Sequence, residues 1–520
     1  MIARVCAFAL ALATSPVAAQ AQDTTVVIDT AAEAGPKIDK HLFGQFAEHL
    51  GTGIYGGVWV GEDSDIPNVR GIRSDVVAAL RDIRVPNVRY PGGCFADEYH
   101  WRDGVGENRR ATVNANWGGA IEPNTFGTDE FFDFIDQIGS EAFISVNVGS
   151  GTIQEAADWM AYMTADQQSA AGQDRAANGH ADQYEVRFLG LGNENWGCGG
   201  NMTPAHYVDL MKRHARFDRN YNMGQPAERA MQRVAVGPNG FETDYTETVM
   251  KAWADRDWSW SFEGLSLHYY SVPEWPPALA STEFGEDDYA LILKTTLNME
   301  RLVTLHSGIM DKHDPGKEVA LVIDEWGVWL AEDPGTREGF LQQQNSLRDG
   351  ILAALNFNIF ARHADRVRAA NIAQMVNVLQ AMLLTDGPRM VKTPTYWIHH
   401  MYLPMQDATL VPARFDAGEY IRGDITLPAV DAVAFRDTAG VLHAALVNID
   451  PHKPRTVELN LGDLRIGSAS GRVLTGPNVN SLNTYDAPET VVPQRIEGQA
   501  NGNRVTVELP PKSVAVLALQ

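Results

Sequence analysis

Short apolar runs recur along the chain from residue 43 to residue 378, and longer stretches with apolar residues at helical spacing separate them. The runs lie at residues 43–46, 87–90, 142–148, 186–191, 233–236, 264–270, 319–323 and 371–378. The helical stretches lie at residues 75–84, 129–138, 154–163, 205–220, 287–306 and 344–363. A run that stops at Gly, Asn, Glu or His predicts a buried strand ending at a surface. The alternation predicts parallel strands joined by helical crossovers.

Eight such units over about 330 residues match an α/β fold of the (β/α)8 TIM-barrel type. A doubly wound open sheet is the alternative. Its dinucleotide-binding form requires Gly-x-Gly-x-x-Gly after a strand. Gly190 and Gly192 begin that pattern, but Asn195 stands where the third glycine is required. We therefore predict the barrel, over residues 39–399.

Beyond residue 400 the helical spacing gives way to short alternating runs separated by Gly, Pro, Asn and Asp. These runs lie at residues 430–435, 443–447, 456–461, 471–474, 504–509 and 513–519. Alternation with a period of two is typical of half-buried strands, so residues 400–520 are predicted to form an antiparallel β-sandwich. A β-branched run at residues 24–28 precedes the barrel, and we assign residues 23–38 to the sandwich.

Residues 1–22 have the composition of a signal peptide. Arg4 precedes an apolar run at residues 5–14, and Ala19-Gln20-Ala21 matches a cleavage site between small residues. The run is too short to span a bilayer, and no other stretch approaches the required length. We expect a periplasmic or secreted protein with no membrane partner.

The chain has 44% hydrophobic residues and a formal net charge of −24. The hydrophobic content is ordinary for a globular protein, so a large core is possible. The negative charge would repel phosphates, which argues against a nucleic-acid partner and favours a neutral substrate. It is equally consistent with plain solubility.

Functional groups of a TIM barrel lie at the carboxyl ends of its strands. Glu194 follows the fourth run and Glu325 the seventh, so these two carboxylates are expected at one rim. Glycosidases use a pair of carboxylates, one on either side of the acetal that is cleaved. Glu194 lies beside apolar groups such as Trp196, which favours a raised pKa and a role as proton donor. A structural salt bridge at the rim is the alternative interpretation.

Other polar and aromatic residues follow the same strands and could bind the hydroxyl groups and rings of a sugar. A carbohydrate-binding protein without catalysis could use them too, but it need not keep both Glu194 and Glu325.

No Cys or His spacing typical of zinc is present, and we expect no metal and no cofactor. Cys94 and Cys198 both follow strand ends, and we hypothesise a disulfide between them, which the sequence leaves open.

Six motifs, taken together and in order, resemble glycoside hydrolase family 51, chiefly the α-L-arabinofuranosidases. They are FGQFAEHLG, RYPGGCFADEYHWRDGVG, LGNENWGCGG, SLHYY, VIDEWGVW and NIAQMVNV, and the resemblance extends from about residue 38 to Ser513. It implies a retaining mechanism that releases terminal non-reducing α-L-arabinofuranosyl residues from oligo- or polysaccharides. Glu194 would be the acid/base and Glu325 the nucleophile. A β-xylosidase or an endo-β-glucanase on the same barrel is the alternative.

The resemblance also implies which residues contact the substrate, and it implies a homo-oligomer, a trimer or a hexamer. Glu48 and Gln374 would bind arabinose hydroxyls. The expected substrate-binding residues are Glu48, Cys94, Asn193, His268, Tyr269, Tyr270, Trp329 and Gln374. The position of Cys94 carries Asn in some family members, so its role here is open.

Overall fold

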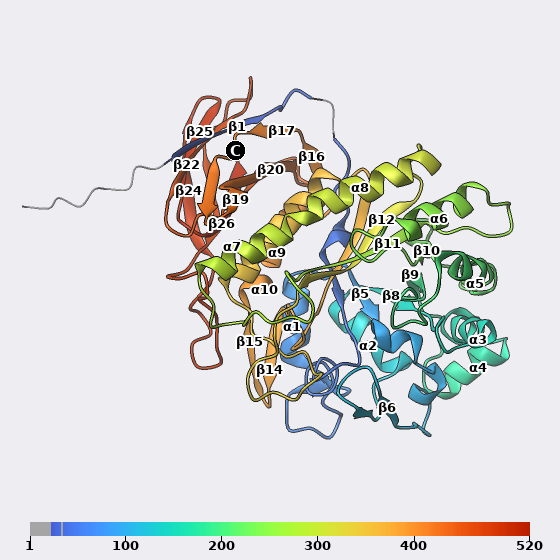
Figure 1. Ribbon diagram of the computed structural model, residues 1–520. Helices are drawn as coiled ribbons and strands as arrows, with labels where there is room; N and C mark the ends of the chain where they lie inside the picture. Colours follow the sequence, from blue (N-terminus) through green and yellow to red (C-terminus); the bar gives the residue numbers. More distant parts are fainter. Residues whose placement is uncertain (1–21, 33–34) are drawn as a thin grey trace, which may run out of the picture.

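A computed structural model describes residues 22–32 and 35–520 of the chain. It consists of a closed barrel of parallel strands surrounded by helices, with a β-rich domain packed against one side (Figure 1). The predicted signal peptide at residues 1–22 lies outside the described residues, apart from Gln22. No helix in the described ranges is long and apolar enough to cross a bilayer.

The barrel closes in the order β10-β11-β12-β13-β2-β5-β8-β9, with every neighbouring pair parallel. Closure occurs where the last strand, β13, pairs with the first, β2. The predicted (β/α)8 fold is thereby confirmed. The strands are β2 Gly44–Phe46, β5 Asn87–Tyr90, β8 Glu141–Ser145, β9 Val186–Leu191, β10 Gln232–Ala235, β11 Gly264–Ser271, β12 Ala320–Val328 and β13 Val367–Ile372.

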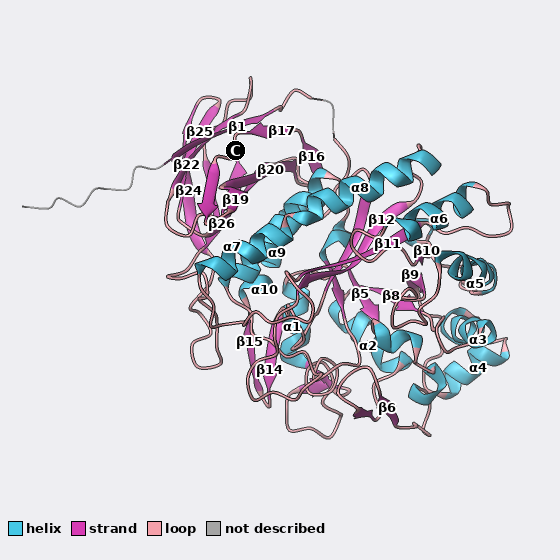
Figure 2. Cartoon of the chain, in the orientation of Figure 1, coloured by secondary structure: helices cyan, strands magenta, loops and turns pink. Residues whose placement is uncertain are grey.

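Helices cover the outside of the barrel (Figure 2). Their starts follow local capping chemistry: the Thr203 side chain accepts a hydrogen bond from the His206 amide, and Pro204 occupies the first helical position of α5. The helices are α1 Ser74–Asp82, α2 Thr128–Ile138, α3 Ile153–Thr164, α4 Ala170–Ala177, α5 Pro204–Phe217, α6 Thr243–Ala254, α7 Glu286–Thr296, α8 Asn298–His313, α9 Leu347–Arg362 and α10 Pro394–Met401.

Three sequence-based bounds are wrong. Residues 287–306 form parts of two helices, α7 and α8, because Leu297 interrupts the helix while the apolar face continues across the break. The eighth strand is β13, which ends at Ile372, whereas residues 371–378 were predicted. Val378 is apolar because it is buried at the barrel mouth with Leu50, and not because it lies in a strand. The seventh strand continues through Glu325 to Val328, with every residue buried.

The second domain is a ten-stranded, mostly antiparallel sheet that folds around its own apolar core. β1 joins it, as expected, but pairs in parallel with β22 and antiparallel with β17. β24 was not predicted because Ile496 is the one large apolar residue in its sequence, so no apolar alternation marks it. The strands are β1 Gln22–Ile28, β16 Thr409–Val411, β17 Ala413–Phe415, β20 Val430–Arg436, β21 Leu442–Asn448, β22 Arg455–Asn460, β23 Ala469–Leu474, β24 Gln494–Asn501, β25 Arg504–Leu509 and β26 Ser513–Leu519.

The two domains share side-chain contacts. Arg362 in α9 forms an ion pair with the buried Asp431 of β20 at 2.9 Å, and the Tyr289 hydroxyl donates to the Ile449 carbonyl at 2.8 Å. α10 spans the predicted boundary at residues 399 and 400, and the exact division stays a prediction. Four hairpins complete the described part of the chain: β3 Asn68–Val69 with β4 Ile72–Arg73, β6 Thr112–Asn114 with β7 Ala120–Glu122, β14 Leu383–Asp386 with β15 Arg389–Lys392, and β18 Glu419–Arg422 with β19 Ile425–Pro428.

Candidate active site

A cavity of about 620 Å³ opens at the carboxyl ends of the barrel strands. Both predicted catalytic residues lie in its wall, and so do most of the predicted substrate-binding residues. Those lining the cavity are Glu48, Cys94, Glu194, Tyr269, Tyr270, Glu325, Trp329 and Gln374. Asn193 and His268 are buried behind the wall and bond to groups around it.

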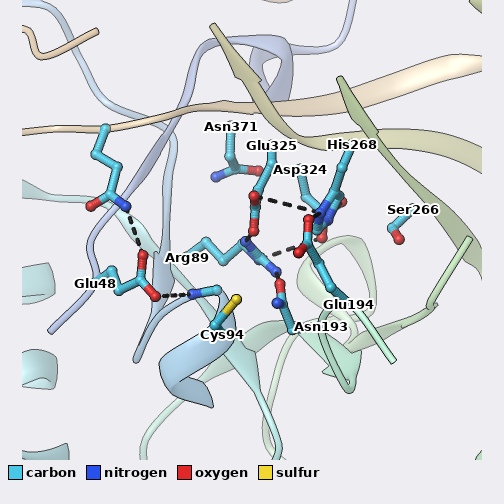
Figure 3. Close-up of polar contacts among 12 residues, drawn as sticks. Glu48, Arg89, Cys94, Asn193, Glu194, Ser266, His268, Asp324, Glu325 and Asn371 are labelled. Atoms are coloured by element: carbon cyan, nitrogen blue, oxygen red, sulfur yellow. Dashed lines mark hydrogen bonds and ion pairs between the residues drawn. The ribbon is translucent and has the colours of Figure 1, made fainter. Parts of the chain in front are cut away.

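Glu325 in β12 is held by two donors from neighbouring strands. Its Oε1 accepts a hydrogen bond from Nη1 of Arg89 in β5 at 2.7 Å (Figure 3). Its Oε2 accepts from the hydroxyl of Tyr270 in β11 at 3.0 Å. Hydrogen bonds from a guanidinium to a carboxylate are charge-assisted and fix its orientation. Glu325 therefore has a fixed direction in the cavity wall.

Glu194 follows β9 and faces Glu325 across the barrel mouth. Its Oε1 lies 2.8 Å from Nδ1 of His268, and the same nitrogen lies 3.5 Å from Oε2 of Glu325. One carboxylate oxygen of each glutamate and a ring nitrogen of His268 lie within 4.8 Å of one another. Two residues that are far apart in the sequence thus meet at a single point.

The charges around this point shift the pKa values of Glu194 and His268. Burial, and then the charge of Glu325, raise the pKa of Glu194. Burial acts to lower the pKa of His268, but Glu325 and Asp324 outweigh it and raise that pKa to about 10. His268 is therefore an imidazolium at neutral pH. Oδ1 of Asp324 lies 3.2 Å from its Nε2 and forms an ion pair with it. The arrangement suits Glu194 to hold a proton that it can donate.

Glu48, after β2, accepts hydrogen bonds at both of its oxygens. Oε1 accepts from the amides of Gly93 and Phe95 and from Nε1 of Trp117, at 2.9, 3.3 and 3.0 Å. Oε2 accepts from Nε2 of Gln374 at 2.8 Å. Burial and the nearby Glu325 nevertheless raise the pKa of Glu48 to about 7. Four donors fix this carboxyl group in the cavity wall, where it can accept from a ligand hydroxyl.

Asn193 and Asp97 connect the strand ends that carry the site by hydrogen bonds. Asn193 accepts from Arg89, which ties the segment carrying Glu194 to the partner of Glu325. Oδ1 of Asp97 accepts from the amides of Val148 and Gly149, at 2.8 Å each, and Oδ2 accepts from the Asn193 amide at 3.1 Å. Burial raises the pKa of Asp97 to about 6 despite these donors. Asp97 joins the ends of three strands and so positions Glu194.

Cys94 and Cys198 form a disulfide, with Cα atoms 5.5 Å apart. It links the turn after β5 to the turn after β9. Sγ of Cys198 lies 3.6 Å from Oε2 of Glu194. Both sulfurs are therefore occupied, so the cluster of Cys94, Glu194 and Cys198 offers no thiolate to a metal.

Aromatic side chains form the outer wall of the cavity. Trp329 contacts Tyr270 edge to face at a centroid distance of 5.1 Å, and Trp275 contacts Trp329 in the same way at 5.0 Å. Trp117 completes this wall. The Tyr269 hydroxyl turns away from the cavity and donates to the Thr295 carbonyl, so only its ring is available to a ligand. Such a wall suits the apolar faces of sugar rings.

Four residues of the site were not identified from the sequence: Arg89, Asp97, Trp117 and Trp275. Arg89 did carry a signal, because a cation in a short buried strand requires a carboxylate partner. Asp97 follows a glycine-rich turn within one of the motifs, which gives no indication of its partners. Trp117 and Trp275 lie in loops, which have no regular sequence pattern from which the orientation of a side chain can be predicted.

Two family profiles match the chain. One is described as an alpha-L-arabinofuranosidase C-terminal domain and covers residues 324–513. The other is described as an alpha-L-arabinofuranosidase 1 domain and covers residues 79–275. The two matches include Glu194 and Glu325.

Curated relatives match over almost the whole chain. An intracellular exo-alpha-L-arabinofuranosidase from Bacteroides ovatus is 43% identical over 97% of this chain and 97% of its own length. An intracellular exo-alpha-(1->5)-L-arabinofuranosidase from Bifidobacterium longum is 27% identical over 94% and 90%. The crystal structure of the GH51 arabinofuranosidase from Xanthomonas axonopodis pv. citri superposes with a TM-score of 0.92, at 47% identity, over 96% of this chain and all of that one.

These relatives contradict one prediction. The Bacteroides and Bifidobacterium enzymes are both named intracellular, so the expectation of a periplasmic or secreted protein is wrong. Arginine followed by a short run of small apolar residues satisfies the composition of a signal peptide, but composition alone does not establish export.

Proposed function

The chain belongs to glycoside hydrolase family 51, the α-L-arabinofuranosidases, and on that basis we propose that Glu325 and Glu194 release arabinofuranosyl residues by double displacement. The observation that carries this proposal is the approach of the two carboxylates to within 4.8 Å. Retaining glycosidases have carboxyl groups about 5 to 5.5 Å apart, whereas inverting enzymes leave room for a water between them.

In the first step the Glu325 carboxylate attacks the anomeric carbon and forms a glycosyl ester. The bond to the leaving oxygen breaks as Glu194 gives its proton to that oxygen. Arg89 and Tyr270 support this role because their hydrogen bonds fix the orientation of Glu325, which lines the cavity. The raised pKa of Glu194 supports its role as the acid.

In the second step Glu194 is a carboxylate and accepts a proton from water. The resulting nucleophile attacks the anomeric carbon, the bond to Glu325 breaks, and arabinose leaves with its original configuration. His268 contacts both glutamates, so it remains close to the developing charge in each half of the reaction. Its positive charge is suited to a site whose negative charge moves from one carboxylate to the other.

Glu48 and Gln374 would bind the hydroxyl groups of the arabinosyl residue. They bond to each other, and both line the cavity that also contains Glu194. Cys94 and the ring of Tyr270 border the same space, and Trp329 would support the next residue of the substrate. Both relatives described above are named exo-acting, which favours terminal residues as the substrate here.

A panel of aryl glycosides tests the activity. We expect turnover of 4-nitrophenyl α-L-arabinofuranoside and far slower turnover of the β-D-xylopyranoside and the β-D-glucoside. Preference for either pyranoside would favour the β-xylosidase or endo-β-glucanase alternative. Proton NMR of the first product tests the mechanism, because double displacement releases α-L-arabinofuranose before mutarotation. Initial release of the β anomer would exclude it.

A homo-oligomer, a trimer or a hexamer, is a further proposal that rests on the family alone. Light scattering coupled to size-exclusion chromatography measures the mass of the assembly directly. A mass of one chain, 57.0 kDa, would exclude it.

A further inference from the structure

The barrel has a second groove, at the end opposite the active site. It is lined by the segments that precede β10 and β11, whose first residues are Gln232 and Gly264, so it lies at the amino ends of the strands. A hollow of about 710 Å³ adjoins another of about 480 Å³ between α5 and α6, and the two share Arg256, Asp257 and Trp260. Together they form an elongated groove.

Large apolar side chains are exposed in this groove. Trp258 is 87% exposed and Met223 is 91% exposed, and both line the larger hollow. Trp260 lies between the two hollows and packs partly against the barrel core, so its position has a structural reason. Trp258 has no such role, because it belongs to none of the hydrophobic clusters found among the described residues. An exposed indole is a platform on which a sugar ring can stack.

Basic side chains outnumber carboxylates in the groove although the chain is strongly acidic. Four arginines and one aspartate, Asp257, line the larger hollow, and the smaller hollow adds two lysines and two aspartates: Lys212, Lys251, Asp209 and Asp255. Two of these arginines have nearby glutamates, but Arg216 and Arg219 have no carboxylate within 4.0 Å in the ranges that the structure describes. The Arg216 guanidinium carbon lies 5.6 Å from the centre of the Trp258 ring. Nη1 of Arg216 donates to the Ser259 carbonyl at 3.4 Å, which leaves its other donors available. A guanidinium beside an indole combines a carboxylate-binding group with a sugar-stacking surface.

The rest of the molecule leaves this face open. In Figure 1, α5 and α6 lie on the side of the barrel away from the β-rich domain. The overall charge of −24 would repel an anion at long range. Interactions beyond about 8 Å are, however, largely screened at physiological ionic strength. The local charge of the groove therefore decides what binds there.

We propose that this groove is a second carbohydrate-binding site, which takes a polysaccharide bearing carboxylate groups. Trp258 stacks on a sugar ring while Arg216 and Arg219 bind uronate carboxylates. The site lies apart from the catalytic cavity, so it retains a polymer without competing with the arabinosyl residue being cleaved. It goes beyond the proposed function and can be tested without reference to hydrolysis.

Affinity electrophoresis with polygalacturonate, which contains no arabinose, measures this binding directly. We expect Trp258→Ala and the double variant Arg216→Gln/Arg219→Gln each to weaken retardation of the protein about tenfold. Neutral arabinan should retard the wild type less than polygalacturonate does, and added salt should weaken binding to polygalacturonate. Turnover of 4-nitrophenyl α-L-arabinofuranoside should be unchanged in both variants, and circular dichroism checks their folding.

Trp275→Ala, which removes an exposed tryptophan at the catalytic cavity, is the matched control and should retain wild-type binding to polygalacturonate. Equal retardation of the wild type and Trp258→Ala would overturn the proposal. So would equal or stronger retardation by neutral arabinan. Self-association that Trp258→Ala abolishes, without any binding of polygalacturonate, would assign the groove to a second copy of the chain and would also overturn it.

Discussion

His268 Nδ1 lies 2.8 Å from Oε1 of Glu194, and the same nitrogen lies 3.5 Å from Oε2 of Glu325. One imidazolium therefore lies close to both carboxylates of the proposed reaction. Glu325 helps to raise the pKa of Glu194 and also that of His268, so the titrations of Glu194 and His268 are linked.

His268→Asn should shift the alkaline limb of the kcat/KM profile to higher pH. The hydrogen bond and charge of His268 lower the pKa of Glu194, against burial and Glu325, which raise it. Removing the imidazolium therefore raises the pKa of Glu194, and the acid stays protonated to higher pH. We also expect kcat/KM at the optimum to fall roughly tenfold to a hundredfold, because a hydrogen bond to a charged group is lost.

A pH series with an aryl arabinofuranoside measures this shift. His214→Asn is the matched control, since His214 is buried in α5 and bonds to Asp218 at 2.8 Å, away from the cavity. An alkaline limb that stays in place, or moves to lower pH, would show that His268 does not control the acid.

Glu325→Ala should abolish turnover of every substrate, because it removes the carboxylate that attacks the anomeric carbon. Glu194→Ala should slow substrates with poor leaving groups about a hundredfold to ten-thousandfold, the usual contribution of a general acid. An activated aryl arabinofuranoside should lose less, since its leaving group needs little protonation. Steady-state kinetics on both substrate types provide the comparison, and equal losses in Glu194→Ala would contradict the acid role.

Asp97→Asn should lower kcat more than it raises KM. The Asp97 carboxylate accepts from the ends of two strands, and an amide would direct an N–H group toward some of these donors. Loss of a buried acceptor costs about 1 to 3 kcal/mol, so we also expect a lower Tm. Asp97→Glu keeps the charge but displaces it, and a partial recovery of kcat there would favour positioning over charge alone. Wild-type kcat in Asp97→Asn would exclude a positioning role.

Trp275→Ala should raise KM for arabino-oligosaccharides several-fold and leave kcat close to wild type. The indole contacts Trp329 at the outer wall of the cavity but makes no hydrogen bond to Glu194 or Glu325 among the described contacts. Aromatic stacking contributes about 0.5 to 1.5 kcal/mol, which corresponds to a few-fold in binding. Kinetics on oligosaccharides of increasing length provide the measurement. Trp258→Ala is the remote control, and an equal effect there would contradict this role.

Glu48 should make the folded protein less stable as the pH rises. Its pKa is about 7 in the folded protein against 4.5 for a free glutamate, so folding favours the protonated form. The unfolded chain loses that proton first, and stability falls between about pH 4.5 and pH 7, by about 3 kcal/mol for this group. Urea unfolding at a series of pH values should show a shallower decline in Glu48→Gln. The exposed Glu62→Gln is the control, and identical slopes in all three proteins would contradict the raised pKa.

The sequence correctly predicted the barrel because short apolar runs that stop at polar residues alternate with stretches of helical spacing. The helices α4, α6 and α10 were not predicted. It also identified Glu194 and Glu325 as candidates, since each follows a short apolar run in the sequence, although Glu325 lies within β12. The break at Leu297 and the end of β13 at Ile372 were not predicted, because apolar residues continue through both points for reasons of packing and not of secondary structure.

The sequence by itself determined the alternation of elements, the second β-rich domain and the family motifs that carry the carboxylates. Only the tertiary structure decided that Arg89 contacts Glu325, that His268 lies between two glutamates and that Arg216 borders an exposed indole. The physical reason is that periodicity is a property of neighbours along the chain. Electrostatic and hydrogen-bonding partners are instead set by distance through space, which closure of the barrel between β13 and β2 fixes.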